Sequence, residues 1–126
     1  TYNNGQWHNV IATFDGTTNA NGLKIYVDGT LASQATASVS GIFSFSSSEP
    51  TIGAEGSALN LTFLGNIDEV AVWNSGTPND ISAMSGLVSW WRMGDGDTYP
   101  TITDNAGSND GLMKNMSSAN FVADVP

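Results

Sequence analysis

The sequence predicts an all-β fold, with short antiparallel strands packed as two layers. Only 12% of the 126 residues are charged and 14 are glycine, a composition that favours strands joined by polar turns over helices. Segments with alternating apolar and polar residues recur, and turn signals separate them about every 8–12 residues, as in β-sandwiches and barrels. Crossover helices between strands are missing, which excludes a parallel α/β architecture.

The first predicted elements are a strand at residues 6–14 and a hairpin formed by residues 23–27 and 30–36. In the first strand, one face carries Trp7, Asn9, Ile11 and Thr13, and the other carries His8, Val10, Ala12 and Phe14. Asp28-Gly29 joins the hairpin strands and suits a type I′ turn, which needs positive φ. Alternation predicts one buried row in the hairpin, made of Leu23, Ile25 and Val27.

The remaining predicted strands are short, and the Ser-rich segment 37–50 is predicted as a loop with one further strand. They cover residues 51–54, 59–64, 67–73, 87–93, 101–103, 111–114 and 120–122. In the segment 59–64, Leu59, Leu61 and Phe63 are predicted to face inward. One short helix is predicted at residues 78–84, because Thr77 can cap it and Pro78 suits its first position.

The charge balance limits the partners. The chain has twelve acidic residues, only three basic ones and no cysteine. Because nucleic acid and anionic membranes attract clustered Lys and Arg side chains, neither is an expected partner. No apolar run approaches the roughly 20 residues that span a bilayer. The carboxylates suit solubility, divalent cations or neutral ligands such as sugars.

Two candidate sites follow. Calcium prefers six to eight oxygen ligands, and the acidic loop near residues 95–110 offers them from Asp95, Asp97, Asp104, Asn105 and Asp110. The alternative is that these side chains only stabilise turns. Sugar rings stack on aromatic faces, which makes Tyr26, Trp90, Arg92 and Tyr99 the candidate ligand-binding residues. Trp90 is predicted to share a strand face with Arg92, which can stack on it. The alternative is core or edge packing.

An enzymatic role is not expected. Glycoside hydrolysis needs two carboxylates across one bond, whereas Asp68 and Glu69 are neighbours that would face opposite sides of a strand. His8 is the only histidine. It is predicted to be a hydrogen-bonded strand residue, since the G-x-S-x-G motif of serine hydrolases is missing.

Several motifs in combination resemble a known family. They are GQWHNVIATFDG, GLKIYVDGTLAS, TIGAEG, FLGNIDEVAVWNSG and NDISAM. Together they resemble the second half of the laminin-G-like, concanavalin A-like lectin-glucanase family. The resemblance covers roughly residues 5–85 and implies an antiparallel jelly-roll β-sandwich. That family often holds calcium at a loop edge.

The C-terminal part brings a second resemblance. Residues 87–126 are similar to the opening segment of the same family and to segments of tailed-phage structural proteins. We therefore expect one domain over residues 1–126, with residues 1–85 as the C-terminal half of the fold and residues 86–126 as a tail. The tail either pairs back with the sandwich or starts a second repeat. The family's early strands are missing before Gln6, which would leave sheet edges unpaired. Because an unpaired edge strand tends to pair with another chain, we expect upstream sequence or an oligomeric setting.

These expectations favour a non-enzymatic structural or adhesion module of a virion or extracellular assembly. Such a decoration or fibre element would form a homo-oligomer, contact other subunits of the assembly and bind glycans. The alternative is a carbohydrate-binding module of a secreted bacterial protein, and the third candidate is a degenerate glucanase.

Overall fold

The computed structural model describes residues 2–36, 38, 50–55, 61–74, 85–123 and 126. The chain divides into two compact units, Thr1–Ser48 and Glu49–Pro126, which are described separately. The strands of the described residues pair antiparallel throughout, which confirms the all-β fold class. The predicted helix at residues 78–84 lies outside the described residues, as does nearly all of the segment 37–50. Within the described part, no helix has the length and apolarity needed to cross a bilayer.

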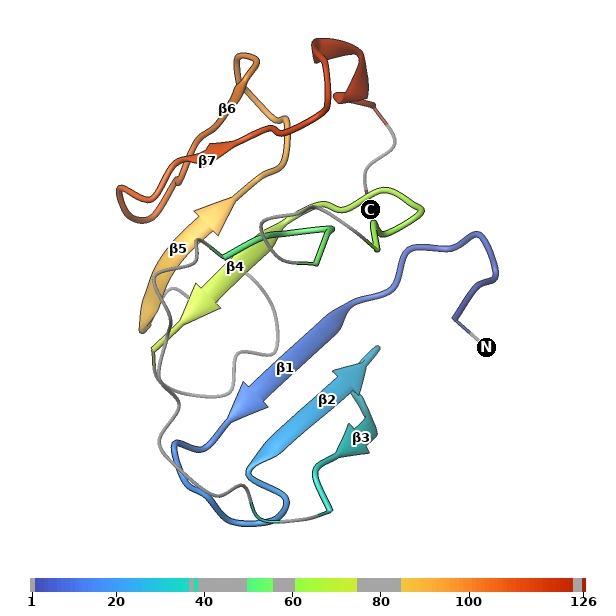
Figure 1. Cartoon of the computed structure of the whole chain (residues 1–126), viewed down its shortest axis with the longest axis vertical. Coiled ribbons are helices and arrows are strands. Elements are labelled where there is room, and N and C mark those ends of the chain that lie inside the picture. Colours follow the sequence, from blue (N-terminus) through green and yellow to red (C-terminus); the bar gives the residue numbers. More distant parts are fainter. Residues whose placement is uncertain (1, 37, 39–49, 56–60, 75–84, 124–125) are drawn as a thin grey trace. The chain divides into compact units, whose positions relative to one another are not determined.

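The first unit contains one sheet with the strand order β1-β2-β3 (Figure 1). The strands are β1 (Val10–Phe14), β2 (Leu23–Val27) and β3 (Thr30–Gln34). In β1 and β2, Val10 pairs with Val27 and Phe14 pairs with Leu23. The predicted hairpin is confirmed, and a bulge between Ile25 and Tyr26 shifts its register.

The hairpin turn depends on left-handed backbone at two consecutive residues. Asp28 has φ 50° and Gly29 has φ 75°, and a Cβ added at Gly29 would meet no atom within 4 Å. The Gly29→Ala change therefore tests backbone conformation alone. We expect it to lower the free energy of unfolding by about 1 kcal/mol. Gly29→Asn should cost less, because asparagine tolerates this region. Urea unfolding measures both, and equal losses would contradict the assignment.

The predicted buried row of the hairpin is wrong at two of its three positions. Val27 is 8% exposed, but Leu23 and Ile25 are 46% and 40% exposed. The register places them on the same sheet face as Val10 and Phe14, which are also exposed. Since the described strands of this unit form a single layer, they do not cover one another's faces.

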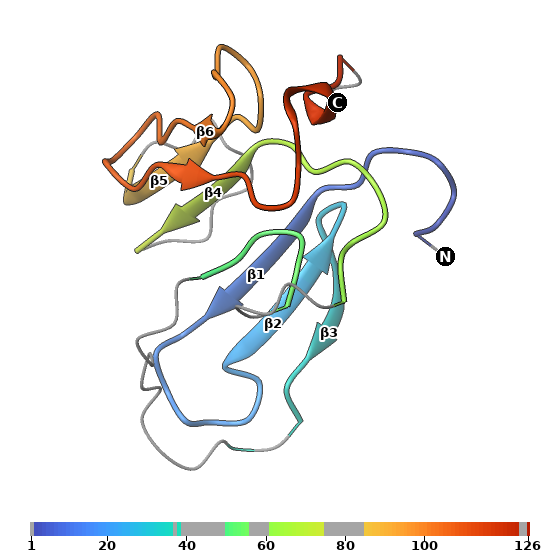
Figure 2. The same ribbon diagram turned by 45° about the horizontal axis from the view of Figure 1, so that its top comes forward.

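The described residues of the second unit form two antiparallel pairs, seen from two directions in Figures 1 and 2. The strands β4 (Val70–Trp73) and β5 (Leu87–Trp91) form one pair. The strands β6 (Thr101–Ile102) and β7 (Gly111–Leu112) form the other. A bridge between Trp91 and Asp104 joins the end of β5 to the loop after β6. A 3-10 turn, η1 (Ser118–Asn120), follows β7.

Several predicted strands are shorter than expected because positive φ values interrupt them. The predicted strand 67–73 begins only at Val70, since Glu69 has φ 51°, and β5 ends before Met93, which has φ 53°. Left-handed backbone cannot continue a strand. β1 also begins later than predicted, at Val10 rather than at residue 6, although no residue from 6 to 9 has a positive φ.

Three predicted strands are wrong within the described residues. Residues 51–54 form bends around Gly53, which has φ 77°. In the segment 59–64, the described residues 61–64 form no strand. Leu61 has φ 50°, and instead of facing inward Leu61 and Phe63 are 80% and 60% exposed. The strand predicted at residues 120–122 does not form: Asn120 ends the η1 turn, and residues 121 and 122 belong to no strand.

Candidate functional site

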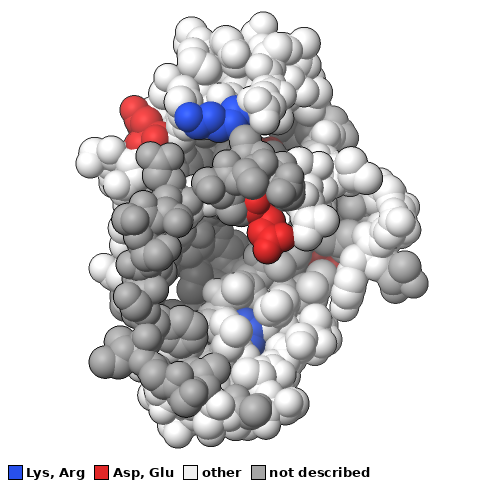
Figure 3. All heavy atoms as spheres, in the orientation of Figure 1, with Lys and Arg blue, Asp and Glu red and all other residues white. Residues whose placement is uncertain are grey.

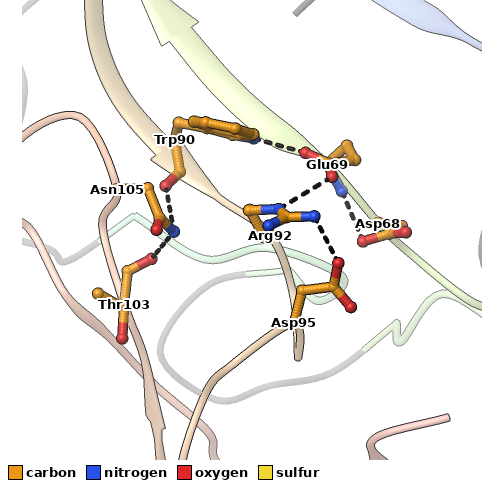
Figure 4. Close-up of polar contacts among 7 residues, drawn as sticks. All are labelled: Asp68, Glu69, Trp90, Arg92, Asp95, Thr103 and Asn105. Atoms are coloured by element: carbon orange, nitrogen blue, oxygen red, sulfur yellow. Dashed lines mark hydrogen bonds and ion pairs between the residues drawn. The ribbon is translucent and has the colours of Figure 1, made fainter. Parts of the chain in front are cut away.

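Four side chains of the second unit form one connected group, which we name the Trp90 cluster: Glu69, Trp90, Arg92 and Asp95 (Figure 4). The indole Nε1 of Trp90 donates to Glu69 Oε2 at 2.5 Å. The guanidinium of Arg92 bonds to Glu69 Oε1 at 3.4 Å and to Asp95 Oδ2 at 2.5 Å. Its Cζ lies 5.6 Å from the centre of the Trp90 ring, within cation–π range.

The β4–β5 pairing positions this cluster. Trp91 pairs with Val70 at the end of the two strands, and Glu69 and Arg92 are the next residues beyond this pair. Trp90 and Arg92 are two residues apart and therefore project to the same side. The predicted stacking of Arg92 on Trp90 is present.

Asp68 adds a third carboxyl group beside the two of the cluster. Its Oδ1 accepts the backbone N–H of Glu69 at 2.9 Å. Burial raises the pKa of Asp68, and the nearby charges of Glu69 and Asp95 raise it further. The site therefore gathers three acidic side chains around one guanidinium.

The other two predicted ligand-binding residues, Tyr26 and Tyr99, are not members of the Trp90 cluster. Tyr26 is a half-buried residue of β2 in the first unit. Tyr99 belongs to the second unit, where its hydroxyl bonds to the Met116 carbonyl at 3.2 Å and its side chain is exposed. Ligand binding at Tyr26, Trp90, Arg92 and Tyr99 stays a prediction.

Asp104 organises the loop in which calcium was predicted. It is 6% exposed. Its Oδ1 accepts the backbone N–H groups of Trp90, Ala106 and Gly107, and its Oδ2 accepts that of Asn109, all within 2.9–3.0 Å. Burial alone would raise the pKa of Asp104, but these four bonds outweigh it and hold the pKa well below its usual range.

The remaining predicted calcium ligands have separate protein partners. Asp95 pairs with Arg92, and Asp110 Oδ1 accepts the Asp104 N–H. Asp97 Oδ1 accepts the N–H of Thr103, and the Asn105 amide donates to the carbonyl of the same Thr103.

These partners decide how well the loop fits a metal ion. Over the ranges that the structure describes, no group of three or more His, Cys, Asp or Glu side chains could hold one. Both oxygens of Asp104 already accept backbone N–H groups. Calcium stays a prediction.

Two functional contacts were missed by the sequence analysis. Glu69 was considered only as a strand residue next to Asp68, because its link to Trp90 requires the β4–β5 register. Asp28 was considered only as a turn residue. Its carboxylate also contacts His8, which lies before β1 rather than within a strand.

Comparison with known proteins adds the family. A laminin G-type family model, described as the concanavalin A-like lectin/glucanases superfamily, matches residues 1–81. No curated protein matches the chain. No solved structure matches it either.

Proposed function

The chain belongs to the concanavalin A-like lectin/glucanases superfamily, and we propose that it is a non-enzymatic module that contacts a neutral glycan through the Trp90 cluster. The observation that carries the proposal is the half-buried indole ring of Trp90 with a guanidinium and two carboxylates around it. An aromatic ring provides an apolar surface for a sugar ring, and the charged groups can bond its hydroxyls.

The charge of the chain supports a neutral ligand rather than an anionic one. The net charge is −9. On the face shown in Figure 3, uncharged residues make up most of the described surface, and acidic and basic atoms are sparse. An acidic polymer would be repelled by this net charge, whereas neutral sugars would not.

The contacts of the carboxylates support a role without catalysis. Both oxygens of Glu69 have partners, in Trp90 and Arg92, and Asp95 is paired with the same guanidinium. A glycosidase needs one carboxyl group free to donate a proton and a second free to act as nucleophile or base. Groups held in ion pairs are poorly suited to both tasks.

We also propose that the module works in an extracellular or virion assembly, together with other copies of the chain. The exposed apolar face of the first unit supports this setting, because an uncovered apolar sheet face favours association. The alternative is a carbohydrate-binding module of a secreted bacterial protein. Both would bind a glycan, and the mass of the native particle or parent chain distinguishes them.

The test is binding of the full chain to an array of neutral and acidic glycans, followed by calorimetry with the best neutral ligand. We expect Trp90→Ala to weaken binding by about thirtyfold, because truncating a tryptophan that anchors a binding site often costs about 2 kcal/mol. Trp90→Phe should retain most of the affinity, since it keeps an aromatic face.

Circular dichroism of both variants checks that the fold is kept. Equal affinities of wild type and Trp90→Ala would overturn the assignment of the site. Failure of every neutral glycan to bind would overturn the proposed function.

A further inference from the structure

His8 has an acceptor oxygen at each of its two ring nitrogens. Nδ1 lies 2.8 Å from Asp28 Oδ2, and Nε2 lies 2.9 Å from Asn4 Oδ1. The imidazole side chain is only 19% exposed. The ring therefore connects the segment before β1 with the turn between β2 and β3, two places twenty residues apart in the sequence.

Each of the two acceptor groups also accepts a backbone N–H, so its orientation is fixed by a second hydrogen bond. The Asn4 Oδ1 atom also accepts the backbone N–H of Gln6 at 2.9 Å, so turning the amide over would break this bond. The other oxygen of Asp28 accepts the backbone N–H of Asn9 at 3.0 Å. The hydrogen bond with His8, and then that with Asn9, lowers the pKa of Asp28, which keeps its carboxylate ionised near neutral pH.

A neutral imidazole has a single N–H, and only the imidazolium can donate from both nitrogens. With two fixed acceptors, the arrangement is complete only when the ring carries two protons. We propose that His8 is a pH-dependent connection that holds the Asn4–Gln6 segment to the β2–β3 turn when protonated and releases Asn4 when it loses a proton.

The charges around the ring determine which protonation state of His8 favours the connection to Asn4. Among the described residues, the titratable groups in contact with His8 are Asp28, from the turn, and Tyr2, whose ring packs edge-on with centroids 5.6 Å apart. After deprotonation, the remaining proton is held at Nδ1 by the carboxylate. The lone pair of Nε2 then faces the Asn4 oxygen and repels it.

The connected state thus binds one more proton than the released state. It is favoured at acidic pH and lost as the pH rises. Above the midpoint, the ratio of connected to released molecules should fall about tenfold per pH unit. The device concerns the first unit alone and does not depend on glycan binding.

Nitrogen-15 NMR of the wild-type chain tests the proposal directly, because the single histidine gives one set of ring signals. At pH 5 we expect both ring nitrogens to be protonated. Between pH 5 and pH 8.5, the side-chain amide signals of Asn4 should move with the same midpoint as the His8 ring. Asn4 signals that stay constant while His8 titrates would overturn the proposal. So would an unprotonated Nε2 at pH 5.

A pair of asparagine variants separates the contact from a general effect. Asn4→Ala removes the acceptor at Nε2, so at any pH where the ring is mostly neutral the doubly protonated fraction of His8 should fall about two- to fivefold. Asn3→Ala, which changes an exposed neighbour in the same segment, should leave this fraction unchanged. Equal fractions in the two variants would contradict a role for Asn4.

Discussion

Replacing Asp104 with alanine is expected to lower the free energy of unfolding of the second unit by about 3–4 kcal/mol. The change removes a buried carboxylate that accepts four backbone N–H groups. Hydrogen bonds to charged groups contribute about 1.5–3 kcal/mol each, and donors left without a partner add a further cost. The sum is limited because the loop can relax and expose some of these donors to water.

Urea unfolding of the full chain, followed by tryptophan fluorescence, measures this loss, since Trp73, Trp90 and Trp91 lie in the second unit. Asp104→Asn is the matched control. Its carbonyl oxygen can keep the three bonds of Oδ1, so it should lose about half as much. A loss below about 1 kcal/mol for the alanine variant would show that the four bonds do not stabilise the unit.

The same residue predicts a dependence on pH. The pKa of Asp104 is lower in the folded chain than in the unfolded chain. Its stabilising contribution is therefore complete above the unfolded value near pH 3.9 and is lost as the pH falls toward the folded value. The difference in stability between wild type and Asp104→Asn should be constant from about pH 7 to pH 5 and shrink below about pH 4.

Local patterns predicted the first sheet well. The β2–β3 hairpin follows from alternation and from Asp28-Gly29, whose positive φ values are a property of those two residue types. The strand cores at residues 10–14 and 70–73 were also recognised. Strand ends were not, because the alternation of apolar and polar residues does not mark the positive φ values at Glu69 and Met93.

Burial was the least predictable property. Alternation shows which side chains share a face, and Leu23 and Ile25 do share one with Val27. It does not show whether another layer covers that face. Likewise, the acidic loop was recognised as a cluster of oxygen ligands, but a sequence cannot show that Asp104 Oδ1 and Oδ2 are occupied by N–H groups from residues as distant as Trp90.

The second large effect is expected from a single methyl group at Gly107. A Cβ at this position would lie 2.6 Å from the backbone oxygen of Val88 and 2.7 Å from Asp104 Oδ2. Contacts this short force a shift, and neither neighbour can move freely, because one is strand backbone and the other is held by Asn109. We expect Gly107→Ala to destabilise the second unit by about 2–3 kcal/mol.

Gly111→Ala provides the matched control in the same unit. There the added Cβ would lie 3.5 Å from Ile102 Cβ, an ordinary contact, and alanine is better than glycine inside a strand. The change should therefore lie between no effect and a gain of about 0.5 kcal/mol. Gly107→Ala leaves every charge in place. If both this variant and Asp104→Ala lower the free energy of unfolding, the close packing of β5 against the Asp104 loop stabilises the unit. Equal free energies of unfolding for Gly107→Ala and Gly111→Ala would contradict this role of the packing.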